Sequence, residues 1–394
     1  MLFGSRLRSV GLALLVLAGA LAIAACGGGG SSSSSSEPSS SGSETNSSGG
    51  GGEGSSSLAA FEKKAEEAFK EGSEPQTNKP PSSGPAGQPG KTIVVIPCSM
   101  ELEGCSRPAD AVLEAAKAIG WHATLINPGG EPQKEAAAVE KAISIGADAI
   151  SLEAVDSKPI LSALEQAKKA GIYLSCFACV DGAGAYDALV PPEESLTKAG
   201  YWIGAAAYKF SNGDAKLLEL TSDEAEVLAL RQDGTNEFIK ECEAAGGECE
   251  VVATEKFSLA EVSTKLPAIT ATFVRQHPDY TVLWSAFDAA LPFIEQGLSQ
   301  TGTQTSEQFA VGFDANEPNV NSIREGGFEK ATVGLPMQWV GFAQVDQLNR
   351  LLAGQPVVDE GVEPKLLTEE NVPSSGAWNG DSDVRPVYEK IWAK

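Results

Sequence analysis

Histidine is almost absent from this chain of 394 residues, which contains only His122 and His277. The two lie far apart, and neither has a cysteine or a second histidine at metal-ligand spacing. The two histidines therefore give little support for a histidine-based metal site or a Ser-His-Asp catalytic centre. The sequence also has no G-x-S-x-G, Walker A or H-E-x-x-H pattern, the usual signatures of hydrolases and nucleotide-binding enzymes. We expect a protein that is not an enzyme and that holds no metal and no cofactor.

Basic residues are also scarce, because 29 lysines and arginines stand against 53 acidic residues, a formal net charge of −24. Proteins bind phosphate backbones through lysine and arginine, so this balance argues against a nucleic-acid partner. The excess negative charge instead predicts a hydrated, self-repelling surface that favours solubility.

The first 25 residues have the layout of an export signal peptide. Arg6 and Arg8 give a positive start, and an apolar run extends from Val10 to Ala25. The run ends in IAAC at 23–26, which resembles the lipobox of bacterial lipoproteins. In that family the chain is cut before the cysteine, whose thiol carries a diacylglycerol. We therefore predict lipidation at Cys26 and an extracytoplasmic location, anchored to the cell membrane. An uncleaved membrane helix is the alternative, but the run is shorter than the ~20 residues that span a bilayer.

A polar tract separates this signal from the folded part. Residues 26–57 are nearly all Gly, Ser, Glu and Thr, so we expect a disordered tether. Residues 58–90 predict a short helix followed by a linker rich in Pro and Ser. Apolar residues at helical spacing between Leu58 and Lys70 make that helix amphipathic. The pattern leaves open whether the helix packs on the domain, contacts a partner or does neither.

From Lys91 onward, short apolar strands alternate with helices. The run TIVVIP at 92–97 is rich in β-branched residues, as a strand buried on both faces requires. Helical patterns such as Pro108–Ile119, closed by Gly120, separate the strands. After four strands the alternation restarts near Glu194. Two blocks of βαβ units predict an α/β fold of two doubly wound lobes with parallel sheets, in which ligands bind beyond the carboxyl ends of the strands.

Six cysteines remain after Cys26, and an even number outside the cytoplasm suggests disulfides. The spacing of one pair, Cys176 and Cys179, also occurs in redox centres. Such a motif opens a helix, however, and Val180-Asp181-Gly182 does not, so we expect structural bridges. Cross-pairing among the first four cysteines is an alternative to local pairing, because all four follow strand ends. The sequence-local pairs are Cys98 with Cys105, Cys176 with Cys179, and Cys242 with Cys249.

A series of segments between Lys91 and about Leu367 resembles the type I periplasmic binding proteins, the group of ribose- and galactose-binding proteins and LacI-like ligand domains. The resemblance rests on the order and spacing of these segments. It implies two lobes joined by a three-strand hinge, with 91–190 and about 336–364 in the first and 191–335 and about 365–394 in the second. It also implies uptake of a sugar or similar solute. The segments are TIVVIP at 92–97, AAKAIGW ending at Trp121, GADAISLEAVDSKPI at 146–160, AKKAGIYL from 167, Arg231 with Gly234, HPDYTVLWSAFDAAL at 277–291, VGFDANEP at 311–318 and REGGFEKATV at 324–333.

Three charged residues correspond by position to ligand-binding residues of that family. They are Arg231, Asp288 and Asp314, the last from a Gly-Phe-Asp motif that follows a predicted strand. Arginine and carboxylate side chains form charge-assisted, bidentate hydrogen bonds, which suits the vicinal hydroxyls of a polyol. The alternatives are salt bridges at the surface or between lobes and, for Asp288, a helix cap.

Other family positions differ in this chain. An asparagine after the first strand corresponds to Leu102, an Asp-Arg pair to Ala178-Cys179, the asparagine before Asp288 to Phe287, and a late glutamine to about Leu335. The pentose-type site is therefore largely replaced, and a disaccharide, an aromatic compound or an amine is an alternative to a monosaccharide. For Trp284, inside a predicted strand, core packing is the alternative to a place in the site. The remaining residues expected to line the site are Ser99, Glu101, Phe177, Trp284, Phe287, Gln338 and Trp339.

The resemblance implies a lipid-anchored, monomeric solute-binding protein that delivers a small polar solute to the permease of an ABC importer. The same fold also serves sensing, so a lipoprotein that signals to a membrane receptor or sensor kinase is the alternative. A DNA-binding sensor would need a helix-turn-helix and basic charge, whereas this chain begins with a lipobox and a Gly/Ser tract. Neighbouring permease and ATPase genes would favour import, and a kinase gene would favour sensing.

Overall fold

The computed structural model describes residues 52–182 and 184–393. The predicted signal peptide 1–25, the predicted lipid site Cys26 and most of the predicted tether lie outside these residues. The amphipathic helix is longer than expected, since α1 runs from Gly52 to Ser73 and includes the last six residues assigned to the tether, 52–57. In the part of the chain that is described, no helix has both the length and the apolar character needed to cross a membrane.

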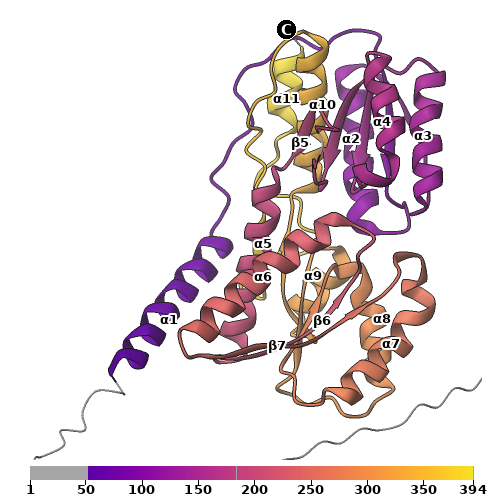
Figure 1. The fold of residues 1–394 in the computed structure, drawn as a ribbon. Helices are drawn as coiled ribbons and strands as arrows, with labels where there is room; N and C mark the ends of the chain where they lie inside the picture. Colours follow the sequence, from indigo (N-terminus) through magenta and orange to yellow (C-terminus); the bar gives the residue numbers. More distant parts are fainter. Residues whose placement is uncertain (1–51, 183, 394) are drawn as a thin grey trace, which may run out of the picture. The chain divides into compact units, whose positions relative to one another are not determined.

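The first lobe is built on a five-stranded sheet. Its elements are β1 (Thr92–Pro97), α2 (Glu103–Ile119), β2 (His122–Leu125), α3 (Pro132–Ser144), β3 (Ala149–Glu153), α4 (Ser157–Lys169), β4 (Tyr173–Phe177), β5 (Ala188–Val190), α10 (Met337–Leu352) and α11 (Arg385–Trp392). The strands are parallel, in the order β2-β1-β3-β4-β5. Helices α2 and α10 cover one face, and α3 and α4 cover the other (Figure 1).

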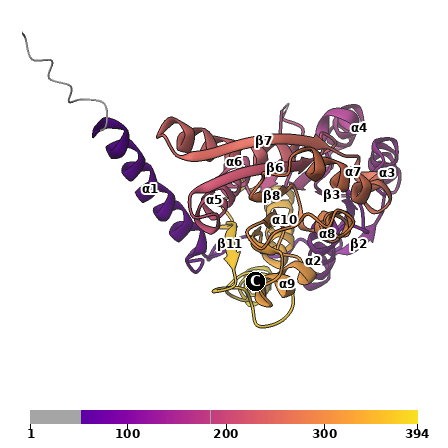
Figure 2. The same cartoon turned by 90° about the horizontal axis from the view of Figure 1, so that it is seen from below.

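The second lobe is built on a six-stranded sheet. Its elements are α5 (Glu193–Phe210), β6 (Asp214–Thr221), α6 (Glu226–Ala244), β7 (Glu248–Lys256), α7 (Val262–Gln276), β8 (Val282–Ser285), α8 (Leu291–Ser299), β9 (Phe309–Phe313), α9 (Glu317–Arg324), β10 (Glu329–Gly334) and β11 (Lys365–Thr368), with 3-10 turns at Leu259–Glu261 and Asp288–Ala290. The order is β11-β10-β9-β8-β6-β7, and only β11 is antiparallel to its neighbour. Helices α5 and α6 pack together on one side and α7 and α8 on the other (Figure 2). The two sheets confirm the predicted α/β fold.

Helix α6 begins at Glu226, and Gly234 lies in its interior. Gly234 interrupts the helical pattern of the sequence, because glycine has a low helix propensity. It is needed where α6 crosses α5: a Cβ at Gly234 would lie 1.9 Å from the carbonyl oxygen of Thr197. Gly200 is needed for the same reason, because a Cβ there would lie 2.0 Å from the carbonyl oxygen of Arg231. Arg231, the predicted ligand-binding residue, therefore lies in α6, at its close crossing with α5.

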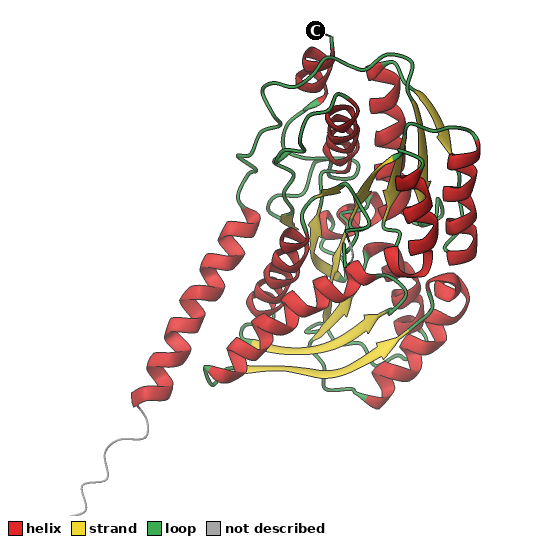
Figure 3. Cartoon of the chain, turned by 45° about the horizontal axis from the view of Figure 1, so that its top comes forward, coloured by secondary structure: helices red, strands yellow, loops and turns green. Residues whose placement is uncertain are grey.

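The amino-terminal segment contacts both lobes. Helix α1 packs on α5 and α6 of the second lobe, and the extended residues 74–90 then run to the first lobe (Figure 3). There the backbone N–H of Gln88 donates to Asn349 Oδ1 at 2.9 Å, and the Arg350 guanidinium donates to the carbonyl oxygen of Ser83 at 2.7 Å. These bonds fix the Pro/Ser-rich linker along α10. Of the alternatives for the predicted helix, the structure shows packing on the domain.

The carboxyl-terminal helix α11 lies on the first lobe, against α10 and α2, whereas residues 365–394 were expected in the second lobe. Aromatic packing accounts for this placement, since the ring of Trp392 stacks on Phe342 with centroids 5.8 Å apart. Trp392 Nε1 also donates to Asp346 Oδ1 at 2.8 Å. Strand β11, by contrast, pairs with β10 in the second lobe, as expected.

Three disulfides join the sequence-local partners, which excludes cross-pairing. Two of them, Cys98–Cys105 and Cys176–Cys179, lie at the carboxyl ends of β1 and β4 in the first lobe. The third, Cys242–Cys249, links the end of α6 to β7. The first two bridges therefore brace the edge of the first sheet at which a ligand is expected.

Candidate functional site

Arg231 and Asp314 meet at the carboxyl edge of the second sheet. Arg231 extends from α6, and Asp314 directly follows β9. Arg231 Nη2 donates to Asp314 Oδ1 at 2.6 Å, and Nη1 donates to the carbonyl oxygen of Ala286 at 2.9 Å. The guanidinium lies 4.9 Å from the centre of the Phe313 ring. Both charged side chains are buried, so they form a desolvated ion pair rather than a surface salt bridge.

Asp314 has an unusual electrostatic and backbone environment. Burial raises the pKa of its carboxyl, and the positive charges of Arg231 and Arg107 partly offset that rise. Its φ is 105°, and that of Ala315 is 52°. Ala154 and Ala178 also have positive φ, at 55° and 53°. All four residues follow the carboxyl ends of β3, β4 or β9, and such backbone strain concentrates at functional sites.

The first lobe reaches Asp314 through the first turns of α2. Gly104 lies so close that a Cβ there would be 2.7 Å from Asp314 Oδ2. Arg107 donates to the carbonyl oxygens of Asp314 and Ala315 at 3.0 and 3.1 Å. Residues of both lobes therefore enclose Asp314.

A second contact joins the lobes through α4 and α6. Both carboxylate oxygens of Asp156 accept the backbone N–H of Glu226 at 3.0 Å. Lys158 forms an ion pair with the Glu226 carboxylate. Burial raises the pKa of Asp156 to about 6, and the neighbouring charge of Glu226 adds to that rise.

Asp288 supports the turn that carries Asp314. Its side chain is fully buried, and Thr332 Oγ1 lies 3.1 and 3.0 Å from its two oxygens. The backbone N–H of Asn316 donates to Asp288 Oδ2 at 3.2 Å. Burial raises the pKa of Asp288, and the Asp314 charge adds to the effect. These contacts hold the residues that follow β9 in place.

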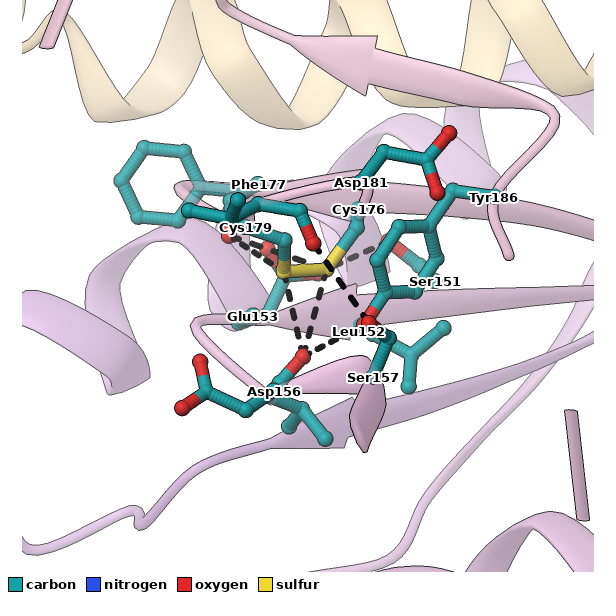
Figure 4. Close-up of a disulfide and its surroundings, with 12 residues drawn as sticks. Ser151, Leu152, Glu153, Asp156, Ser157, Cys176, Phe177, Cys179, Asp181 and Tyr186 are labelled. Carbon is teal, nitrogen blue, oxygen red and sulfur yellow. Dashed lines mark hydrogen bonds between the residues drawn. A yellow bond between two sulfur atoms is a disulfide. The ribbon is translucent and has the colours of Figure 1, made fainter. Parts of the chain in front are cut away.

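Two of the predicted aromatic residues lie at strand ends. Phe177 ends β4, and in Figure 4 its ring points away from the Cys176–Cys179 disulfide and from Tyr186. Phe287 follows β8, and its ring centroid lies 5.9 Å from that of Phe257, which follows β7. All three rings are largely buried. They give this edge of the two sheets an apolar component.

Trp284 lies in the core of the second lobe. It is fully buried in β8, and its ring packs edge-on against Phe313 with centroids 5.5 Å apart. Its Nε1 donates to Thr235 Oγ1 at 3.0 Å. These contacts match the core-packing alternative for this residue.

The other predicted lining residues lie in the first lobe. Ser99 is buried in the 98–105 disulfide loop and accepts the N–H of Glu101 at 3.2 Å, while the Glu101 side chain is exposed. Gln338 donates to Glu114 at 3.1 Å. Trp339 is buried and donates to the Tyr388 hydroxyl at 3.1 Å, so it packs between α10 and α11.

The sequence interpretation did not single out two residues near these strand ends, Arg107 and Glu153. Glu153 ends β3 and is fully buried, and its Oε1 accepts from Ser151 Oγ at 2.7 Å (Figure 4). Its Oε2 has no hydrogen-bond partner among the described residues. Burial raises its pKa well above the usual value. A carboxylate at the end of an apolar strand was a usable signal for Glu153, whereas no local pattern marks Arg107.

Chemically, the arrangement offers donors, acceptors and aromatic faces for a polar solute. A guanidinium, carboxyls and rings surround strand ends, as in sites that bind without reaction. Over residues 52–182 and 184–393, no group of three or more His, Cys, Asp or Glu side chains is arranged to hold a metal ion.

Comparison with known proteins gives a family match. Residues 93–356 match the family model described as "Periplasmic binding protein domain". A D-apiose import binding protein from Paraburkholderia graminis is 24% identical over 267 residues, which cover 67% of this chain and 82% of that protein.

Two solved structures show the same fold. A glucose-galactose binding protein from Geobacillus stearothermophilus superposes with a TM-score of 0.64 at 19% identity, over 72% of this chain and 99% of that one. An ABC transporter solute binding protein from Agrobacterium vitis, with bound allitol, gives a TM-score of 0.64 at 17% identity, over 72% and 97% of the two chains.

Proposed function

The chain belongs to the periplasmic binding protein domain family, and from that membership we propose that it captures a sugar-like solute between its lobes for an ABC importer. Membership implies a location outside the cytoplasm. The family consists of binding proteins rather than enzymes, in agreement with the prediction that the chain is not an enzyme.

The Arg231–Asp314 pair is the observation that carries this proposal. Two buried charges lie at the carboxyl ends of parallel strands, the usual ligand position in such sheets. From the other lobe, Gly104 lies beside the Asp314 carboxylate and Arg107 donates to the Asp314 carbonyl oxygen. A solute bound here would contact both lobes, so binding would favour their closed arrangement.

The polar and aromatic groups support a solute with several hydroxyls and an apolar face. Asp314 and Arg231 offer charge-assisted hydrogen bonds, and one oxygen of Glu153 has no partner in the part of the chain that the structure describes. Phe177 and Phe287 would cover C–H faces of a sugar ring. The relatives named above bind or import apiose, glucose and galactose, or hold allitol, and so support the same class.

A thermal-shift screen tests this proposal. The panel contains D-apiose, D-galactose, L-arabinose and allitol, with a disaccharide, an aromatic acid and a polyamine as alternative classes. A solute that binds only the native state adds about 2.7 kcal/mol of stability at a hundred times its Kd and so raises the Tm. We expect a shift with one of the sugars or polyols. A shift only with the amine or the aromatic acid would change the solute class, and no shift with any compound would contradict solute capture.

We also propose that the protein is anchored by a lipid on Cys26. The motif IAAC at 23–26, preceded by a basic and then an apolar segment, supports this attachment. Mass spectrometry of the protein from its native membrane should find a diacylglycerol-modified Cys26 as the first residue. A Cys26→Ser variant should be found in the medium rather than in the membrane fraction. A wild-type protein whose Cys26 carries no diacylglycerol in the mass spectrum would contradict the anchor.

A further inference from the structure

Arg107 lies in the first lobe, yet its guanidinium donates to acceptors of the second lobe. Nη1 contacts the turn after β9, and Nη2 contacts the loop between β11 and α11. The acceptors are the carbonyl oxygens of Asp314 (3.0 Å), Ala315 (3.1 Å) and Trp378 (2.5 Å) and the side-chain oxygens of Asn316 (3.3 Å) and Asn379 (3.0 Å).

This bonding pattern depends on the closed arrangement of the lobes. One guanidinium reaches two separate segments of the opposite lobe, so opening the lobes would break these bonds together. A guanidinium can do this because its planar fork presents five N–H donors in fixed directions. The opened state would return Arg107 and the carbonyl groups to water, which makes the net gain of closure smaller than the gross bond energies.

Arg107 also acts on the backbone of Asp314. Asp314 and Ala315 both have positive φ, and their carbonyl oxygens converge on Arg107 Nη1. Arg231 holds the Asp314 carboxylate from the second lobe, while Arg107 holds its carbonyl from the first lobe. Asp314 is thus held by two arginines, one from each lobe, and only its bond to Arg107 depends on closure.

We propose that Arg107 is a positioning residue that latches the closed lobes and slows solute release by holding the Asp314 turn. The inference rests on the proposed function, because release presupposes a captured solute. Arg107 acts through the backbone of Asp314 and not on the solute itself. Its loss therefore changes the dissociation rate far more than the association rate.

The test compares wild type with Arg107→Ala and Arg107→Lys. Binding kinetics are followed by stopped-flow tryptophan fluorescence with D-apiose, or with the panel sugar of largest thermal shift. We expect Arg107→Ala to dissociate about ten- to a hundredfold faster, with little change in association, and Arg107→Lys to recover only part of the loss because it lacks the fork. In small-angle scattering without sugar, Arg107→Ala should have a larger radius of gyration than wild type.

Arg385→Ala is the matched control, because Arg385 pairs with Asp383 and Glu114 and, among the described residues, makes no hydrogen bond to the second lobe. It should keep wild-type kinetics and radius. If Arg107→Ala does not fold, Asn379→Ala removes one acceptor of the latch from an exposed position and should show a smaller change in the same direction. Wild-type dissociation rates and radius in Arg107→Ala would overturn the latch. If wild type binds no sugar, the proposed function fails, while the scattering comparison still decides whether Arg107 holds the lobes together.

Discussion

Arg231 connects several groups of the candidate site, since it contacts Asp314, the Ala286 carbonyl and the Phe313 ring. A solute hydroxyl that hydrogen-bonds to its guanidinium would gain a charge-assisted bond. We therefore predict that Arg231→Ala weakens sugar binding by about 1.5–3 kcal/mol, measured by titration calorimetry with the panel sugar that binds. The same change leaves the Asp314 carboxylate buried without its partner, so it should also lower the free energy of unfolding, by about 3–5 kcal/mol.

Two further variants separate these effects. Arg231→Lys keeps the positive charge beside Asp314 but loses the planar guanidinium with its several donors. It should therefore lower the free energy of unfolding less than Arg231→Ala does, while sugar binding is still weakened. Arg324→Ala removes an arginine of the same lobe that bonds to Pro373 and Asn321 instead, and it should bind sugar normally. Unchanged affinity in folded Arg231→Ala would remove Arg231 from the site.

Glu135 of α3 makes stability depend on pH. Its side chain is mostly buried, and burial, with a smaller effect of Asp156, raises its pKa to about 7. The folded protein therefore keeps a proton that the unfolded chain loses near pH 4.5, so the free energy of unfolding falls as pH rises from about 4.5 to 7. We predict that Glu135→Gln is about 1–2 kcal/mol more stable than wild type at pH 8, allowing for partial solvent screening, and about equal at pH 4.

Urea unfolding at pH 4, 6 and 8 measures this difference. Glu140→Gln, an exposed change on the same helix, should leave the pH dependence of wild type intact. Equal stabilities of Glu135→Gln and wild type at pH 8 would show that Glu135 is ionised at no cost in the folded protein.

At the scale of elements, α1 is held by an aromatic contact with the second lobe. The ring of Phe61 lies 5.1 Å from that of Phe238 and 5.3 Å from that of Tyr208. Loss of a buried phenylalanine side chain costs about 3–5 kcal/mol, enough to release a single helix. We predict that Phe61→Ala lowers the hydrogen-exchange protection of residues 58–73 about a hundredfold or more while the two sheets stay protected.

Lys63→Ala is the control for that helix, since Lys63 is exposed and pairs with Glu67 one turn away. Its hydrogen exchange should match that of wild type, because surface substitutions of this kind change the free energy of unfolding by no more than about 0.5 kcal/mol. Wild-type protection of α1 in Phe61→Ala would mean that α5 and α6 do not hold it through this ring.

The sequence predicted the long, fully buried elements best. The strand expected at 92–97 matches β1, because continuous apolar runs are typical of strands covered on both faces. The three-residue β5 has too little pattern to be found. The local pattern does not mark the start of α6, because Gly234 weakens the helical signal and only its crossing with α5 explains that glycine.

Within the site, sequence predicts residues that strand ends bring together. Asp314 and Phe177 could be placed because parallel strands end at a common edge. Arg107 could not, because its acceptors lie more than two hundred residues away in the other lobe, 207 for Asp314 and 271 for Trp378. Contacts that depend on how two lobes meet leave no trace in local periodicity.

At the scale of the whole molecule, the chain joins the lobes by more than the expected hinge. The three crossovers after β5, β10 and α10 lie at 191–192, 335–336 and 353–364. In the described part of the chain, residues 74–91 after α1 and 369–384 before α11 also pass from the second lobe to the first. Any hinge motion must be compatible with all these connections, so we expect opening of limited amplitude.

Solute binding should shift this molecule toward its closed arrangement. The solute contacts both lobes only when they meet, so it binds the closed state more tightly and raises its population. We predict a smaller radius of gyration in scattering with saturating panel sugar than without it, and a larger decrease for Arg107→Ala, whose free form is more open. Maltose, if it gives no thermal shift, is the matched additive control and should leave the radius unchanged. A sugar that raises the Tm but leaves the scattering of both proteins unchanged would show capture within one lobe, without closure.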